Sequence, residues 1–144
     1  MILLAPEHLE EIAAEAEAAY PEECCGLLVG HARGKGGFEV VRVVPSPNVD
    51  PQGGRGRFEI DPRLLLELQR TLRHGPERII GHYHSHPDHP ASPSARDLDR
   101  AWQPGLVWLI TSVAGGAAVE TKAHVLERGG GFREIELTAT AGKS

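Results

Sequence analysis

Hydrophobic and polar positions follow regular patterns along this chain, and these patterns predict two helices in its first half. Apolar residues at i, i+3, i+4 and i+7 predict an amphipathic helix that begins near Pro6 and ends before Pro21. A second helix is predicted to begin at Asp61 and Pro62, which are typical of an N-cap and a first helical position. The apolar faces of these helices consist of Leu9, Ile12, Ala13 and Ala16, and of Leu64, Leu65, Leu68 and Leu72.

Short apolar or alternating runs predict the strands. They cover residues 24–30, 38–44, 57–60, 78–86, 106–113, 119–127 and 132–137. The run 106–113 is nearly all apolar, which indicates a central strand buried on both faces. A third helix is predicted over residues 94–102. Residues 45–57 are rich in Pro and Gly and lack periodicity, which indicates a long loop.

Alternating helices and strands with antiparallel hairpins indicate an α/β fold. We expect one three-layer domain over residues 1–137, with a mixed central sheet flanked by helices. Residues 138–144 are expected to form a flexible tail. A length of 144 residues, with 40% hydrophobic and 24% charged residues, is ordinary for a single soluble globular domain.

The composition indicates the cellular compartment and excludes some classes of binding partner. The net charge of −5 argues against nucleic-acid binding, because phosphate contacts need clustered basic residues. No apolar stretch is long enough for a membrane span, and the apolar residues 1–4 are too few for a signal peptide. Cys24 and Cys25 are the only cysteines, and their position in an apolar run predicts buried thiols in a reducing compartment. We therefore expect a cytoplasmic protein.

The most informative stretch is residues 82–97, HYHSHPDHPASPSARD, which contains four histidines. If the preceding strand runs to His86, period-two alternation places His84 and His86 on one face and Ser85 on the other. Two imidazoles at this spacing can bind one zinc ion, and the carboxylate of Asp97 offers a third ligand. Three protein ligands leave a position open for water, which is typical of catalytic zinc.

The segment His84-Ser85-His86-Pro87, followed after six residues by Ser94 and after two more by Asp97, resembles the signature of the JAMM/MPN+ metalloprotease family. Residues 21–28, 58–62 and 109–113 also resemble bacterial members. The resemblance implies a cytidine-deaminase-like arrangement of the three layers. It further implies that His84, His86 and Asp97 bind one zinc ion per chain, with Glu23 as general base and Ser94 as a donor to the oxyanion.

Several of these residues have structural interpretations as well. Ser94 and Asp97 also match a capping box, in which both side chains satisfy the start of a helix, and the histidine pair alone also fits a surface cluster. His82 shares the face of His84, so an all-histidine site is a further alternative, although many family members have Trp there. Glu22 is adjacent to Glu23. Four other residues are expected at the mouth of the site or on the exposed surface: Asp88, His89, His74 and His124.

The resemblance predicts a zinc-dependent peptidase or isopeptidase. Its expected substrate is a ubiquitin-like or sulfur-carrier protein, cleaved after a C-terminal Gly-Gly, and residues 45–57 are a candidate flap over that tail. A non-catalytic zinc-containing interaction module is the alternative. Nucleoside deamination is set aside because the P-C-x-x-C signature is absent. The sequence determines neither the oligomeric state nor the identity of the substrate.

Overall fold

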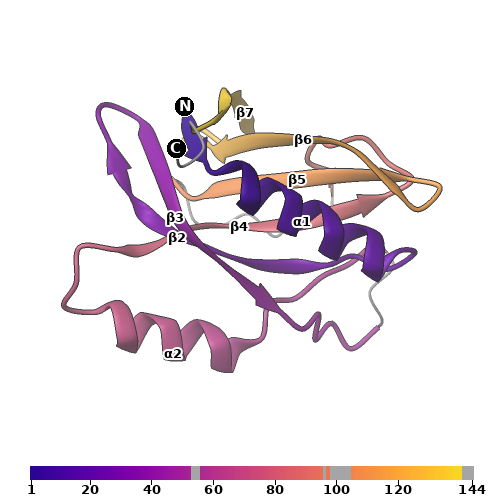
Figure 1. Ribbon diagram of the computed structural model, residues 1–144, viewed down its shortest axis with the longest axis horizontal. Coiled ribbons are helices and arrows are strands. Elements are labelled where there is room, and N and C mark those ends of the chain that lie inside the picture. Colours follow the sequence, from indigo (N-terminus) through magenta and orange to yellow (C-terminus); the bar gives the residue numbers. More distant parts are fainter. Residues whose placement is uncertain (53–55, 96, 98–104, 141–144) are drawn as a thin grey trace.

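The computed structural model describes residues 1–52, 56–95, 97 and 105–140, which form one mixed sheet of eight strands with helices on its faces (Figure 1). The strand order is β7-β6-β5-β4-β2-β3-β1-β8. The elements are β1 (Ile2–Leu4), α1 (Pro6–Ala19), β2 (Cys25–Arg33), β3 (Gly37–Ser46), α2 (Pro62–Leu72), β4 (Arg78–Pro87), β5 (Val107–Ala114), β6 (Ala117–Leu126), β7 (Phe132–Ile135) and β8 (Leu137–Ala139).

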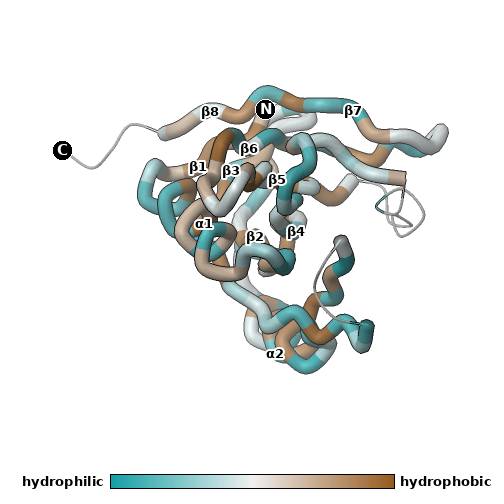
Figure 2. The backbone as a smooth tube through the Cα atoms, turned by 90° about the vertical axis from the view of Figure 1, so that its right-hand side faces the viewer, coloured by the Kyte–Doolittle hydropathy of each residue, from teal (hydrophilic) through white to brown (hydrophobic). Residues whose placement is uncertain are grey.

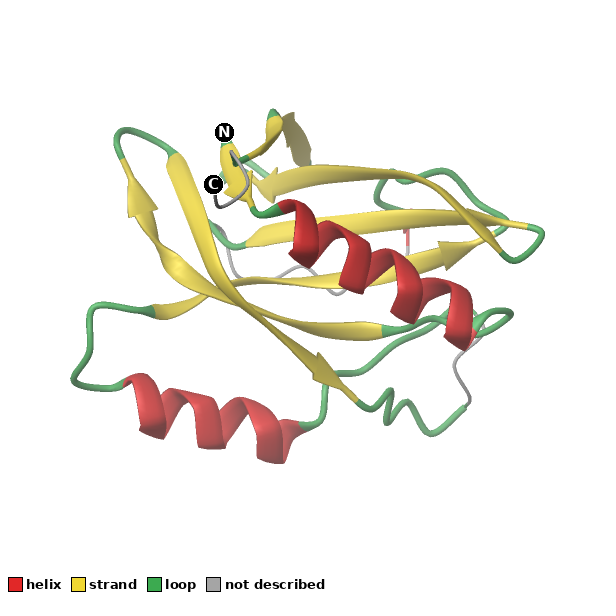
Figure 3. Ribbon diagram, viewed as in Figure 1, coloured by secondary structure: helices red, strands yellow, loops and turns green. Residues whose placement is uncertain are grey.

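Helices α1 and α2 pack on opposite faces of the sheet (Figure 3). Ile12 and Ala16 of α1 belong to the main core, together with Leu28 of β2. Leu68 of α2 instead packs in the cluster that contains Leu27, whose side chain points to the other side of the same strand. The predicted three-layer α/β fold is therefore confirmed. None of the described helices is long and apolar enough to span a membrane.

The sheet combines parallel and antiparallel pairs, as the sequence predicted. β4 and β5 are parallel, β1 is parallel to β3 and β8, and the remaining pairs are antiparallel. β4 lies centrally between β2 and β5, with Cys25 opposite His84 on one side and Ile110 opposite His84 on the other. The histidines predicted as ligands therefore lie near the carboxyl end of a central strand, where α/β sheets commonly bind ligands.

The two ends of the chain form strands that the sequence did not predict. β1 pairs in parallel with β3 and β8, and the N–H of Thr140 donates to the carbonyl of Leu4 (2.8 Å). The prediction of a tail from residue 138 is wrong for residues 138–140, whose backbone is held by this pairing; residues 141–144 lie outside the described part. Only Glu136 separates β7 at one edge from β8 at the other, so the sheet curls and brings its edges together (Figure 2).

Two predicted elements between the strands have different outcomes. Residues 57–60 form no strand, because their pairing is limited to a single bridge between Asn48 and Ile60. The predicted N-cap of α2 is confirmed, since the Asp61 carboxylate accepts from the N–H of Arg63 (3.0 Å). Of the helix predicted over residues 94–102, the structure describes the start, and residues 96 and 98–102 lie outside the described part.

Candidate metal centre and active site

His84 and His86 point to the same side of β4, and their Nε2 atoms are 3.1 Å apart. Both side chains are buried, that of His84 completely. Tyr83 points to the opposite side, where its hydroxyl donates to the carboxylate of Glu15 on α1. Strand alternation therefore separates a pair of convergent imidazoles from the side chains that anchor α1.

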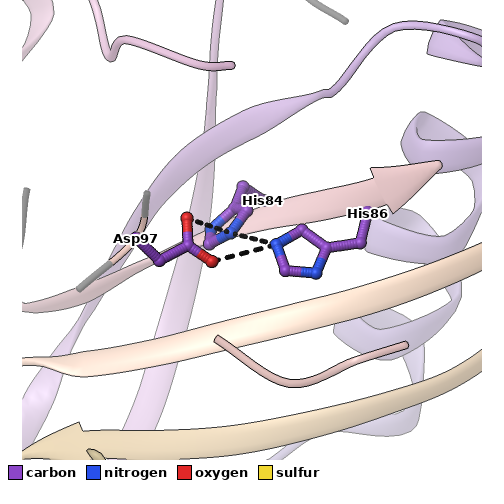
Figure 4. A group of neighbouring side chains, drawn as sticks. All are labelled: His84, His86 and Asp97. Atoms are coloured by element: carbon purple, nitrogen blue, oxygen red, sulfur yellow. Dashed lines mark hydrogen bonds and ion pairs between the residues drawn. The ribbon is translucent and has the colours of Figure 1, made fainter. Parts of the chain in front are cut away.

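Asp97 brings its carboxylate to both imidazoles (Figure 4). Its Oδ2 lies 3.0 Å from Nε2 of His86, and its Oδ1 lies 3.5 Å from Nε2 of His84. The same carboxylate accepts from the N–H of Ser94 (2.9 Å), while the Ser94 hydroxyl accepts from the N–H of Asp97 (3.0 Å). This reciprocal pair is a capping box. The capping interpretation and the ligand interpretation are therefore compatible in one geometry.

The surroundings of the three side chains influence their protonation. His86 Nδ1 lies 2.8 Å from the carbonyl of Pro90, which can only accept, so Nδ1 carries the hydrogen and Nε2 faces Asp97. Burial lowers the pKa of His84. Burial, the largest single effect, would lower the pKa of His86 and raise that of Asp97. The hydrogen bonds and charges around them together outweigh it: those of Asp97 and the Pro90 carbonyl raise the pKa of His86, and those of His84, His86 and the Ser94 backbone lower that of Asp97. The ionised carboxylate thus favours a positive charge beside it, either a proton or a metal ion.

The donor set fits a zinc ion. The described residues bring together two imidazole nitrogens and a carboxylate oxygen within 4.8 Å of one another, all from buried side chains. Nitrogen ligands bind zinc at about 2.0–2.1 Å in tetrahedral geometry, so two of them lie roughly 3.3 Å apart. The observed separation of 3.1 Å between the Nε2 atoms is close to this value. His82 is not part of the group, so its geometry does not support the all-histidine alternative.

Glu23 lies two residues before β2 and is 6% exposed, whereas Glu22 is exposed. Two hydrogen bonds extend the alignment of β2 with β4 beyond its first pair: Ser85 N–H donates to Cys24 O (3.1 Å), and Cys24 N–H donates to Ser85 Oγ (2.9 Å). Antiparallel register then places Glu23 across from His86. The negative charge of Glu23 also contributes to the raised pKa of His86, behind the larger effects of burial and hydrogen bonding.

The loop between His86 and Ser94 is held by side chains from three neighbouring strands. Ser112 of β5 donates to His89 O (2.7 Å), and His124 of β6 lies with Nε2 3.0 Å from Ala91 O. Together with the His86–Pro90 contact, three successive carbonyls are engaged. The prediction that His124 is exposed is wrong, because it is 4% exposed. The alternation of side chains along β6 explains the burial: Ala123 faces the α1 side of the sheet, so His124 faces the opposite side, where it contacts the loop.

Aromatic side chains enclose the ligand pair on the α2 side. Phe58 stacks on His84 with ring centroids 4.2 Å apart, and His82 packs against Trp108 at 4.3 Å. Burial, and then the charge of His84, lower the pKa of His82 to about 3, so its ring is neutral. A cavity of about 880 Å³ between α2 and the sheet is lined partly by His82 and Trp108. The sequence motif gave no indication of Phe58 as a neighbour of His84.

Asp88 and His89 line a small hollow beside the end of β4. This hollow of about 320 Å³ is lined by Gly56, Pro87, Asp88 and His89. It therefore brings Gly56 of the long loop next to Pro87 at the end of the ligand strand, while the position of Asp88 and His89 at the mouth of the site stays a prediction. Asp88 has a structural role as well, because its carboxylate accepts from the hydroxyl of Tyr20 (2.6 Å) and the N–H of Gly115 (2.9 Å).

A mixed α/β sheet that presents two buried histidines and an aspartate beside a buried glutamate has the architecture of a metal-dependent hydrolase. The chain belongs to the family of prokaryotic homologs of the JAB domain, whose model matches residues 5–126. The expected relationship to JAMM/MPN+ proteins is confirmed.

Two relatives support assignment to an enzyme family. The chain is 35% identical to a desampylase of Haloferax volcanii over 117 residues, which cover 81% of this chain and 78% of the relative. It is 36% identical to a probable TtuB-protein conjugate cleaving protease of Thermus thermophilus over 102 residues, which cover 70% of this chain and 64% of the relative. Both names denote hydrolases, and the chain is accordingly a hydrolase of this family.

Solved structures with the same fold support the architecture. The solution structure of a protein from Desulfitobacterium hafniense is similar with a TM-score of 0.82 and 36% identity, covering 97% of this chain and 93% of that one. A JAB1/MPN domain protein from Archaeoglobus fulgidus has a TM-score of 0.60 at 21% identity, covering 98% of this chain and all of that one. The second similarity concerns the fold alone.

Proposed function

We propose that this chain is a zinc-dependent isopeptidase that cleaves ubiquitin-like proteins from their conjugates after a C-terminal Gly-Gly. The observation that carries the proposal is the buried group of His84, His86 and Asp97, with Glu23 across from His86. Family membership and the two relatives, a desampylase and a conjugate-cleaving protease, support the substrate class.

His84, His86 and Asp97 would hold one zinc ion per chain. When bound, zinc supplies a nucleophile at neutral pH, because it lowers the pKa of a bound water molecule to about 7. The chain's own contribution is to hold the donors in place before the ion arrives. Asp97 is fixed by the N–H of Ser94, and His86 is oriented by the carbonyl of Pro90.

Glu23 would act as the general base and then as the general acid. Its carboxylate takes the proton of the attacking water and returns it to the leaving amine, which for an isopeptide bond is the side-chain nitrogen of a lysine. Proton transfer by a positioned group contributes roughly 10²–10⁴-fold. The position of Glu23 across from His86 supports this role, and its low exposure keeps the proton near the reacting atoms.

Ser94 would stabilise the negative charge that develops on the scissile carbonyl oxygen. Its Oγ accepts the N–H of Asp97, so the hydroxyl hydrogen can be directed to another acceptor. The residue is exposed and lies three positions from Asp97, where a substrate can reach it. A donor aimed at a developing oxyanion is worth about 10²–10³ in kcat.

A Gly-Gly terminus would need little room to reach these residues. Glycines carry no side chain, so an extended tail would occupy the hollow between Gly56 and His89, beside the end of the ligand strand, with its backbone alone. Residues 45–57 would then act as a flap over the tail. Backbone hydrogen bonds to such an extended segment would give affinity without requiring side-chain pockets at its last two positions.

The proposed function is tested by substrate trapping in the native cell. Glu23→Gln should bind metal as wild type does, because Glu23 is not a ligand, and should retain conjugates that it cannot cleave. Mass spectrometry of the captured proteins is expected to identify a ubiquitin-like protein ending in Gly-Gly. Glu22→Gln, which alters the adjacent exposed acid, is the matched control and should trap nothing. Equal capture by both variants, with no turnover by the wild-type protein, would instead favour a non-catalytic interaction module.

A further inference from the structure

Asn48 is the only asparagine of the chain, and its side-chain amide makes four hydrogen bonds at the base of the long loop. Its Nδ2 donates to the carbonyls of Glu23 (3.1 Å) and Arg57 (3.0 Å). Its Oδ1 accepts from the N–H groups of Asp50 (3.2 Å) and Glu59 (3.0 Å). Both donor hydrogens and both acceptor positions of the amide are therefore used.

The two ends of the loop meet at this residue. Asn48 forms a β-bridge with Ile60, and the N–H of Val49 donates to the carbonyl of Glu59 (3.0 Å). Phe58, which stacks on His84, lies between the two loop residues that Asn48 contacts, Arg57 and Glu59. The amide of Asn48 thus links the segment that carries Phe58, the residue stacked on His84, to the backbone of Glu23.

The backbone around Glu23 is held from two sides. β2 begins at Cys25, and Cys24 is joined to Ser85 by two hydrogen bonds that approach from β4. The contact from Asn48 to the Glu23 carbonyl comes from the loop on the other side. Among the described residues, the β2–β3 ladder begins only at Cys25, opposite Ser46. The side-chain amide of Asn48 supplies the hydrogen bond on the loop side of Glu23.

We propose that Asn48 is a positioning residue that holds Glu23 in register with His86 through its carbonyl. The inference rests on the proposed role of Glu23 and assigns a further residue to the same reaction. A displacement of about 1 Å at a reacting group can cost on the order of 10²-fold in rate. Asn48 does not need to touch the substrate to have such an effect.

Two substitutions test the hydrogen bonds of Asn48, one that removes the donors alone and one that removes donors and acceptors together. Asn48→Asp keeps oxygens that can accept from Asp50 and Glu59, but it directs an oxygen at the carbonyls of Glu23 and Arg57. Asn48→Ala removes all four contacts. We expect both variants to lower kcat on a lysine-linked Gly-Gly conjugate by roughly 10- to 100-fold, with KM within about threefold of wild type and zinc content unchanged. If Asn48→Asp keeps the wild-type kcat, the donors to Glu23 are unimportant and the inference is wrong.

Ser46→Ala is the matched control. Ser46 also closes the base of the loop, because its hydroxyl accepts from the N–H of Asp61 (2.9 Å) and donates to Pro47 O (2.8 Å), and neither of these hydrogen bonds involves Glu23. This variant should keep kcat. A decrease equal to that of Asn48→Asp would mean that loop closure, rather than the position of Glu23, is responsible.

A double-mutant cycle with Glu23→Asp tests whether Asn48 acts through Glu23. The shortened carboxylate already misplaces the base, so Asn48→Asp should add less than about twofold on this background. Independent effects that multiply would contradict the inference. An inactive wild-type protein would refute the proposed function itself, whereas an active wild type with unaffected Asn48 variants would refute only this inference.

Discussion

At the level of single residues, the carboxylate of Asp97 has two roles, as a helix cap and as a candidate metal ligand, which are alternative interpretations of the sequence. It accepts the N–H of Ser94 at the start of a helix, and it faces the Nε2 atoms of His84 and His86. The capping contact orients the carboxylate before any ion binds, which reduces the entropy lost on coordination. A capping box and a ligand set are therefore parts of the same local structure.

Substitution of Ser94 separates its capping role from its catalytic role. Ser94→Ala removes the N-cap oxygen and should lower the free energy of unfolding by about 0.5–2 kcal/mol. It also removes the proposed oxyanion donor, so kcat should fall about 10²–10³-fold while bound zinc is retained. Denaturant unfolding and steady-state kinetics measure the two effects, with the exposed Ser92→Ala as control. A loss of stability with unchanged kcat would restrict Ser94 to capping.

The buried thiols give a pH dependence of stability. Burial raises the pKa of Cys24 to about 11 and that of Cys25 to about 12, from 9.0. The folded state then binds these protons more tightly than the unfolded state, so their contribution to stability is present below pH 9 and is lost between pH 9 and 12. Each group contributes a slope of about 1.4 kcal/mol per pH unit. Unfolding measured across this range should show a smaller slope in Cys25→Ala; equal slopes would contradict the assignment.

At the level of elements, the strands around β4 determine the course of the loop that leads to Ser94 and Asp97. Side chains from β4, β5 and β6 engage three successive carbonyls, those of His89, Pro90 and Ala91. β5 runs parallel to β4, so the chain must cross the sheet between them, and this loop begins the crossover. Anchoring its backbone to three strands fixes the course of the chain toward Ser94 and Asp97.

His124 provides a test of this anchoring. His124→Phe keeps a ring of similar shape but removes the donor to Ala91 O, which leaves a buried carbonyl unsatisfied at a cost of about 1–3 kcal/mol. Because the loop then holds Asp97 less firmly, zinc affinity should fall on the order of tenfold. Competition with a chromophoric chelator measures the affinity, and the exposed His74→Phe is the control. Unchanged affinity in His124→Phe would show that the loop is held without it.

Hydrophobic periodicity predicted both described helices and six of the strands, because each of these elements buries a recognisable face. It missed β1 and β8, which contain three residues each and are stabilised by pairing between the two ends of the chain. No local pattern reports such a pairing. Residues 57–60 were assigned as a strand from their alternation, although their ladder is a single bridge to Asn48.

At the level of the whole molecule, the site is assembled by the sheet. Glu23 and the histidines are separated by about sixty residues, and the antiparallel alignment of β2 with β4 brings them together. The motif predicted His84, His86, Ser94 and Asp97 because their spacing is fixed within one segment. It could not predict Asn48, Phe58, Ser112 or His124, since these residues reach the site through tertiary contacts that leave no fixed spacing.

The central claim is that zinc held by His84, His86 and Asp97, with Glu23 as base, hydrolyses a Gly-Gly isopeptide bond. The most direct test incubates purified protein with a ubiquitin-fold carrier linked through Gly-Gly to a lysine and follows the products by mass. We predict release of the carrier with an intact Gly-Gly carboxylate, loss of turnover on chelation or in Glu23→Gln, and recovery when zinc is restored. Cleavage that persists after complete removal of metal, or in Glu23→Gln, would contradict this account.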